Sequence, residues 1–118
     1  MKIAIIGSRT VIVKNLGEYI SKNDELVSGG AKGVDSCAAE YAKANGMKIT
    51  EFLPEYEKYG RAAPIVRNKK IVDYADKVIA FWDGTSKGTK HVIDQCKRLG
   101  KGVTVHVIEK WTSDALRK

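Results

Sequence analysis

The chain has 118 residues, of which 43% are hydrophobic and 30% charged, and this is the composition of one soluble globular domain. It has no apolar stretch near the ~20 residues of a membrane-spanning helix and no signal-peptide pattern, which argues against a membrane or secreted protein and favours a cytoplasmic one. Lysine and arginine outnumber aspartate and glutamate by 21 to 14, and the formal net charge of +7 favours anionic partners such as nucleotides, nucleic acid or phosphosugars.

In the first half of the chain, short apolar runs alternate with helical patterns. The runs at 2–6, 25–28 and 47–52 predict three strands. Apolar residues at helical spacing predict one helix around 12–20 and a second that begins near residue 34. The pair Asn45-Gly46 is expected to end the second helix, because glycine readily adopts the left-handed conformation that closes helices.

The second half continues the alternation after a predicted loop at 53–63. Pro64 suits the first turn of a helix that runs to about Ala75, and the run at 77–82 predicts a fourth strand. Apolar residues from Thr89 to Leu99 form another helical stripe, which Gly100 closes, and 102–108 is a fifth strand.

Strands that alternate with helices through short connections predict an α/β fold, an open parallel sheet of about five strands with helices on both faces. We expect one domain over 1–110, followed by a C-terminal tail at 111–118. Ligands of such sheets bind beyond the carboxyl ends of the strands. Three polar, glycine-bearing loops meet at that edge, and they contain Gly7, Ser8 and Arg9, then Ser28, Gly29 and Gly30, then Asp83 and Gly84.

The stretch "SGGAKGVD" (28–35) joins a predicted strand to a helix. Its glycines (Gly29, Gly30, Gly33) and Lys32 favour an anion at the N–H groups of the helix start, although the spacing is neither GxGxxG nor a P-loop. The alternative is a tight turn selected for geometry alone. Asp35 either interacts favourably with the helix dipole, which is a structural role, or has a functional role. In the functional role it binds a ribose hydroxyl or acts as a base.

The stretch "WDGTSKGT" (82–89) is a second glycine-rich turn before a helix. One of the two hydroxyl residues, Ser86 or Thr89, is explained as the N-cap of the helix. A contact to a phosphate or a sugar would explain why the stretch also contains the other hydroxyl and Gly88. Trp82 either stacks on a base or packs in the core.

Asn68 is a polar residue within the apolar stripe of the helix that begins at Pro64. A buried amide without partners costs ~1–3 kcal/mol, so we expect it to bond either the neighbouring loops or a ligand. Arg67 lies at a helix start, where the dipole disfavours a cation, and a nearby anion would explain it.

Neither cysteine (Cys37, Cys96) has a CxxC partner, and neither histidine (His91, His106) has a second ligand placed beside it. We therefore expect no disulfide, no metal and no cofactor. The chain also has no Ser-His-Asp order and no close carboxylate pair typical of catalysis.

Four strings resemble, in order, the superfamily that joins the DNA-processing protein Smf/DprA with the LOG (Lonely Guy) proteins. "IIGSR" (5–9) is similar to its first strand and loop, and "SGGAKGVD" to the DprA pattern SGxAxGID. "RNKKIVDYADKVIAF" (67–81) is similar to RNRIIAxLSDxVLVV, and "SKGT" (86–89) to the later SGS/SGT turn. The strings span about residues 3 to 107, and the similarity is greatest to the small, single-domain YspA-like branch.

The resemblance implies a Rossmann-like fold with a pocket for nucleotides or nucleotide derivatives, and a homodimer. It carries the site to Gly7, Ser8, Arg9, Gly29, Gly30, Gly33, Asp35, Arg67, Asn68, Ser86, Gly88 and Thr89. Two positions depart from the pattern. Val92 stands where LOG enzymes have the glutamate of GGxGTxxE, and Ala39 stands where DprA proteins have a histidine.

The sequence thus predicts a module that binds a nucleotide or nucleotide-derived ligand, as a sensor or as a processing module. Glycine N–H groups, Ser86, Thr89, Arg9 and Arg67 would bind phosphate, and Asp35 would orient a ribose. One alternative is a hydrolase of a nucleotide N-glycosidic or nucleotide-sugar bond, with Asp35 or Asp83 as the acid. The other is a DprA-like protein that binds single-stranded DNA through its positive charge.

Overall fold

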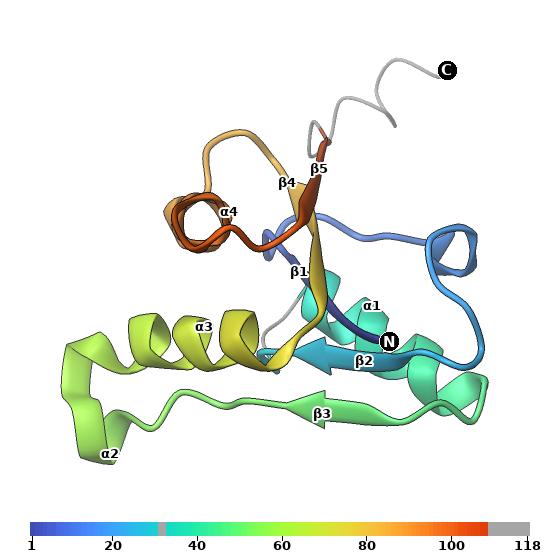
Figure 1. Ribbon diagram of the computed structural model, residues 1–118, viewed down its shortest axis with the longest axis horizontal. Coiled ribbons are helices and arrows are strands. Elements are labelled where there is room, and N and C mark those ends of the chain that lie inside the picture. The colour runs from blue at the N-terminus through green and yellow to red at the C-terminus, as the bar shows by residue number, and fades with distance from the viewer. Residues whose placement is uncertain (31–32, 109–118) are drawn as a thin grey trace.

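The structure is a computed structural model, and it describes residues 1–30 and 33–108. Within these ranges five parallel strands form one sheet in the order β3-β2-β1-β4-β5 (Figure 1). The strands are β1 (Lys2–Gly7), β2 (Glu25–Ser28), β3 (Ile49–Glu51), β4 (Lys77–Trp82) and β5 (Val103–Val107). The predicted α/β fold, a Rossmann-like open parallel sheet, is confirmed.

Helices cover both faces of the sheet, as the alternating pattern predicts. Figure 1 shows α3 and α4 on one side, with α1 and the chain between β1 and β2 on the other. The helices are α1 (Val34–Ala44), α2 (Tyr56–Tyr59), α3 (Ala63–Tyr74) and α4 (Lys87–Leu99), with short 3₁₀ turns η1 (Leu16–Glu18) and η2 (Gly60–Ala62). Pro64 lies in the first turn of α3, and Gly100 ends α4 in the left-handed conformation with φ 72°.

The sheet divides the core into two clusters, because successive side chains of a strand point to opposite faces. On β1, Ile3 and Ile5 pack with α1, whereas Ala4 and Ile6 pack with α3 and α4. Both faces of the central strands are buried, which explains why β1 and β4 are continuous apolar runs in the sequence.

The helix predicted around 12–20 is wrong. Only the single turn η1 forms there, and Val11 and Val13 are buried while Ile12 is 70% exposed. That alternation has a period of two, which is typical of an extended segment and not of a helix. The three consecutive β-branched residues also disfavour a helix because their side chains lose rotamer freedom in it.

The loop predicted at 53–63 is also partly wrong, because α2 and η2 form within it. Neither turn buries a residue, so no apolar periodicity marks them in the sequence. Ile65 of the predicted apolar stripe is 52% exposed, so the stripe is not buried at the start of α3. The expected tail at 111–118 lies outside the described residues, and the single domain over 1–110 stays a prediction. None of the described helices combines the length and apolar character that crossing a bilayer requires.

Candidate functional site

A cavity of about 400 Å³ lies at the carboxyl edge of the sheet, where β1 and β4 end side by side. The chain leaves β1 for β2 on one side and reaches β4 on the other, and this switch point is where open α/β sheets bind ligands. The volume falls within the range of about 300–1,000 Å³ typical of small-molecule sites. The cavity is lined by Ile6, Gly7, Arg9, Thr10, Gly29, Asp35, Pro64, Arg67, Asn68, Ile71, Asp83, Ser86, Gly88, Thr89 and Val92.

Asp83 organises the loop between β4 and α4. Its Oδ1 accepts hydrogen bonds from the N–H groups of Thr85 (2.9 Å) and Ser86 (2.7 Å), and its Oδ2 accepts one from the Thr10 hydroxyl (3.0 Å). Burial raises the pKa of Asp83, but these bonds outweigh it and hold the pKa at about 2. Asp83 is therefore ionised and committed to the loop, and it is poorly suited to act as a general acid near neutral pH.

Arg67 crosses from α3 to the loop after β2. Its Nε donates to Oδ1 of Asn68 at 2.8 Å, and its Nη1 donates to the carbonyl oxygen of Gly29 at 2.7 Å. A Cβ on Gly29 would lie 2.6 Å from Nη1, so an alanine there would displace this guanidinium. Asn68 is 7% exposed, and its Oδ1 has the protein partner that a buried amide requires.

The cavity contains charges of both signs. Burial lowers the pKa of Arg67, Asp35 acts against this by raising it, and Arg9 lowers it further. Arg9 is exposed and, within 1–30 and 33–108, makes no ion pair. Asp35 lies in the first turn of α1 and is 6% exposed. Two arginines thus share the cavity at a mutual electrostatic cost, which a bound anion would relieve.

The start of α4 forms another wall. Ser86 is the N-cap residue, but its hydroxyl does not bond a helix N–H and lies 3.3 Å from the hydroxyl of Thr89. Space is open around Gly88, so a ligand can approach its backbone. Capping by the Ser86 side chain, which the sequence pattern favours for one hydroxyl, is therefore not what this residue does here.

Most of the predicted site residues come together around this cavity. The ones that line it are Gly7, Arg9, Gly29, Asp35, Arg67, Asn68, Asp83, Ser86, Gly88 and Thr89. They come from five separate segments of the chain, which the sheet topology gathers at one edge.

Other predicted residues support the loops without lining the cavity. Ser8 is 2% exposed, and its Oγ accepts the N–H of Asp83 while its own N–H donates to the Phe81 carbonyl. The Oγ of Ser28 accepts the N–H of Gly30 at 3.2 Å. These two serines fix the ends of β1 and β2.

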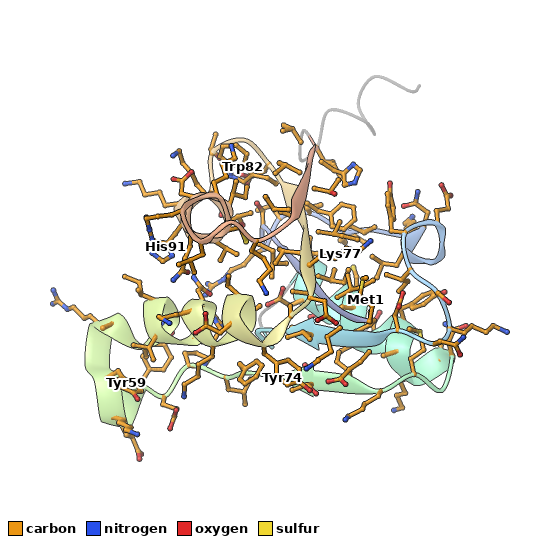
Figure 2. All side chains as sticks on the ribbon, in the orientation of Figure 1. Met1, Tyr59, Tyr74, Lys77, Trp82 and His91 are labelled. Atoms are coloured by element: carbon orange, nitrogen blue, oxygen red, sulfur yellow. The ribbon has the colours of Figure 1, made fainter. Side chains whose placement is uncertain are left out.

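Three further predicted residues serve the backbone or the core. Gly33 begins α1 with φ 74°, and a Cβ there would lie 2.5 Å from the carbonyl oxygen of Arg9. Gly84 turns the chain with φ 86°. Trp82 packs on the α3–α4 side of the core and donates its indole N–H to the carbonyl of Ser86, so it is placed for packing and not for stacking on a ligand in this cavity (Figure 2). Lys32, also predicted for the site, lies outside the described residues.

Five lining residues were not predicted from the sequence. Ile6, Ile71 and Val92 belong to the core pattern, and nothing in that pattern distinguishes a core position from a cavity wall. Thr10 directly follows the predicted loop residues, and its adjacency to them was the available signal. Pro64 was assigned only to the helix start. Within the described residues, no group of three or more histidines, cysteines or acidic residues is placed to hold a metal ion.

Comparison with known proteins gives one match. No curated protein and no solved structure matches the chain. The sequence model of the YspA, cpYpsA-related SLOG family matches residues 1–59, which is half of the chain and includes β1, β2, α1 and β3. The chain therefore belongs to the YspA, cpYpsA-related SLOG family.

Proposed function

We propose that this protein binds a nucleotide or nucleotide-derived ligand in the cavity between β1, β4, α3 and α4, as a sensor or as a processing module. The observation that carries the proposal is the meeting of Arg9, Arg67 and the start of α4 at one cavity of suitable size. Membership of the SLOG family fits a nucleotide-related function in general.

The chemistry of the walls suits a phosphorylated ligand. Arg9 supplies a charge that no described acidic group neutralises in an ion pair, and the open backbone at Gly88 lies in the first turn of α4, where N–H groups favour an anion. The apolar residues Ile6, Ile71 and Val92 supply the hydrophobic part of the lining that organic ligands need.

The first test is thermal unfolding with a panel of nucleoside mono- and diphosphates and NAD derivatives. A ligand at ~100 times its Kd adds ~2.7 kcal/mol to the free energy of unfolding, and this raises Tm by roughly 10 °C for a domain of this size. Arg9→Ala should remove most of this shift. Arg98→Ala, which removes the same charge from the exposed end of α4, should keep it.

A panel that leaves Tm unchanged would remove the support for a nucleotide ligand. The salt dependence of binding then separates the single-stranded DNA alternative, because an affinity that falls steeply with added salt marks contacts to many phosphates. Self-association also stays a prediction. Size-exclusion chromatography with light scattering tests it by measuring the molar mass of the protein in solution.

Hydrolysis of an N-glycosidic bond is the second candidate, and the position of Asp35 favours it. This carboxylate is buried, lines the cavity and raises the pKa of Arg67 by its charge. Asp83 has a pKa of about 2, so it is ionised near neutral pH and cannot supply the proton that a general acid donates. The second candidate predicts that nucleoside monophosphates release free base, and that Asp35→Asn stops this release while the Tm shift persists. If nucleotides bind and none of them releases free base, the result favours a sensor over a hydrolase.

A further inference from the structure

The two arginines of the cavity differ in how many of their nitrogens are committed. Arg67 donates from Nε to Asn68 and from Nη1 to Gly29. Both edges through which a guanidinium grips a phosphate with two parallel bonds therefore contain a nitrogen that is already bonded to the protein. Arg9 donates to no acceptor in the described part of the chain.

The same contacts hold the Arg67 guanidinium in a fixed orientation. Its two bonds join it to different elements, α3 and the loop after β2. Gly29 packs directly against it, because a Cβ there would lie 2.6 Å from Nη1 and 3.1 Å from Cζ. A fixed, planar cation that lines a cavity is a surface on which an aromatic ring can stack.

Two exposed apolar side chains lie near the elements that hold Arg67, outside the lining of the cavity itself. Leu53 is 62% exposed and contacts Gly30. Gly30 directly follows Gly29, whose carbonyl accepts the bond from Arg67. Tyr56 is 58% exposed at the start of α2. The adjacent Glu55 pairs with Lys70 at 2.9 Å, which places the start of α2 beside α3. Arg67 lies on α3 one turn before Lys70.

The electrostatics agree with this placement, since Tyr56 contributes to raising the pKa of Arg67 against the dominant lowering by burial. Trp82, the other aromatic residue considered for stacking, is half-buried against the α3–α4 side of the core and donates its indole N–H to the carbonyl of Ser86 beside the start of α4. Tyr56 is an exposed aromatic side chain, and the pair between its neighbour Glu55 and Lys70 places it beside α3, the helix that carries Arg67.

We infer that the ligand has a planar ring, such as a nucleobase, which lies over the Arg67 guanidinium beside Tyr56 and Leu53, and an anionic group that Arg9 binds. This inference rests on the proposed function and adds to it the orientation of the ligand. Arg67 selects the ring by its flat surface, and Arg9 supplies affinity for the anion.

Calorimetric titration with two probes tests the inference. Adenosine 5′-monophosphate has both the planar ring and the anionic phosphate, whereas ribose 5-phosphate has the phosphate and the sugar without the ring. Stacking of a base is worth about 1–3 kcal/mol, so the wild-type protein should prefer the nucleotide by roughly 5- to 150-fold. Guanosine, cytidine and uridine monophosphates serve as equivalent ring-bearing probes.

The variants separate the two ends of the ligand. Tyr56→Ala and Arg67→Lys should each reduce the preference for the nucleotide by about fivefold or more, with a smaller change in ribose 5-phosphate affinity. Arg9→Ala should weaken both probes by a similar factor. Tyr59→Ala is the matched control, because Tyr59 lies on the same helix and contacts Lys58 and Lys70 instead (Figure 2).

The failure of the inference is distinct from failure of the proposed function. A wild-type protein that binds these probes, with a preference that neither Tyr56→Ala nor Arg67→Lys reduces, would overturn the inference alone. A wild-type protein that binds neither ribose 5-phosphate nor any of the four nucleotides would overturn both. Tyr56 is exposed, so its substitution should leave urea unfolding unchanged and make the binding result interpretable.

Discussion

The loop that carries Asp83 should lose measurable stability when its charge is removed. In Asp83→Asn the amide oxygen still accepts hydrogen bonds from the backbone, but the charge that strengthens them is lost. Lowering a carboxyl pKa from its ordinary 3.8 to about 2 is worth roughly 2.4 kcal/mol at about 1.36 kcal/mol per pKa unit. The Asp83 side chain is partly exposed, so screening by water reduces the expected cost to about 1–2 kcal/mol.

The pH dependence gives the assay its specificity. The folded-state pKa of Asp83 is depressed, so its contribution is present above the unfolded pKa near 4 and is lost as pH falls toward 2. Urea unfolding at pH 7 should therefore place Asp83→Asn about 1–2 kcal/mol below the wild-type protein. By linkage, this difference should be about half as large near pH 3.

Asp73→Asn is the matched control, because Asp73 forms an exposed pair with Lys69 on α3. Exposed pairs of this kind contribute roughly 0.3–0.5 kcal/mol, so the control should be nearly as stable as the wild-type protein at both pH values. A difference for Asp83→Asn that is absent at pH 7, or that is as large at pH 3 as at pH 7, would refute the assigned role of this carboxylate.

Four further substitutions test the loops and the sheet. Gly33→Ala should lower the free energy of unfolding by at least about 3 kcal/mol, because φ is 74° and the new Cβ would meet backbone oxygens, whereas Gly88→Ala, in open space on α4, should be neutral or stabilising in the same urea titration. Tyr74→Phe removes the 2.6 Å bond to Glu25 and should cost about 1 kcal/mol at pH 7. Because that bond lowers the Glu25 pKa from 4.5, this cost should diminish as pH falls below that value, and an undiminished cost in acid would contradict the assignment. Gly29→Ala should displace the neighbouring guanidinium, cost only about 1 kcal/mol because a flexible side chain moves, and weaken nucleotide binding in calorimetry.

The strands and long helices were predictable because burial and periodicity agree in them. The four central residues of β4 are all buried, and Pro64 and Gly100 mark helix ends by their backbone chemistry. The helix around 12–20 was predicted wrongly because Ile12, Leu16, Tyr19 and Ile20 recur at helical spacing. Tertiary packing instead buries Val11 and Val13 on either side of exposed Ile12, which is the pattern of an extended segment.

The loops that form the candidate site could be predicted from the sequence, but the role of each side chain in those loops was harder to predict. Parallel topology alone brings the loops after β1, β2 and β4 to one edge, so Gly7, Gly29 and Asp83 were placed together by the fold class. The direction of side chains was beyond such reasoning. Ser8 accepts a hydrogen bond from the backbone of Asp83, and Trp82 packs half-buried against the core, although each is adjacent in sequence to a cavity residue.

The cavity takes its walls unequally from the two halves of the chain. The segment by which the family is identified ends at residue 59, whereas α3, the β4–α4 loop and α4 all follow it. Two proteins can thus share every residue of the identifying stretch and still enclose differently shaped, differently charged spaces. Nine of the fifteen lining residues follow residue 59 and six precede it, so the walls of the cavity can differ between two chains whose identifying stretches are the same.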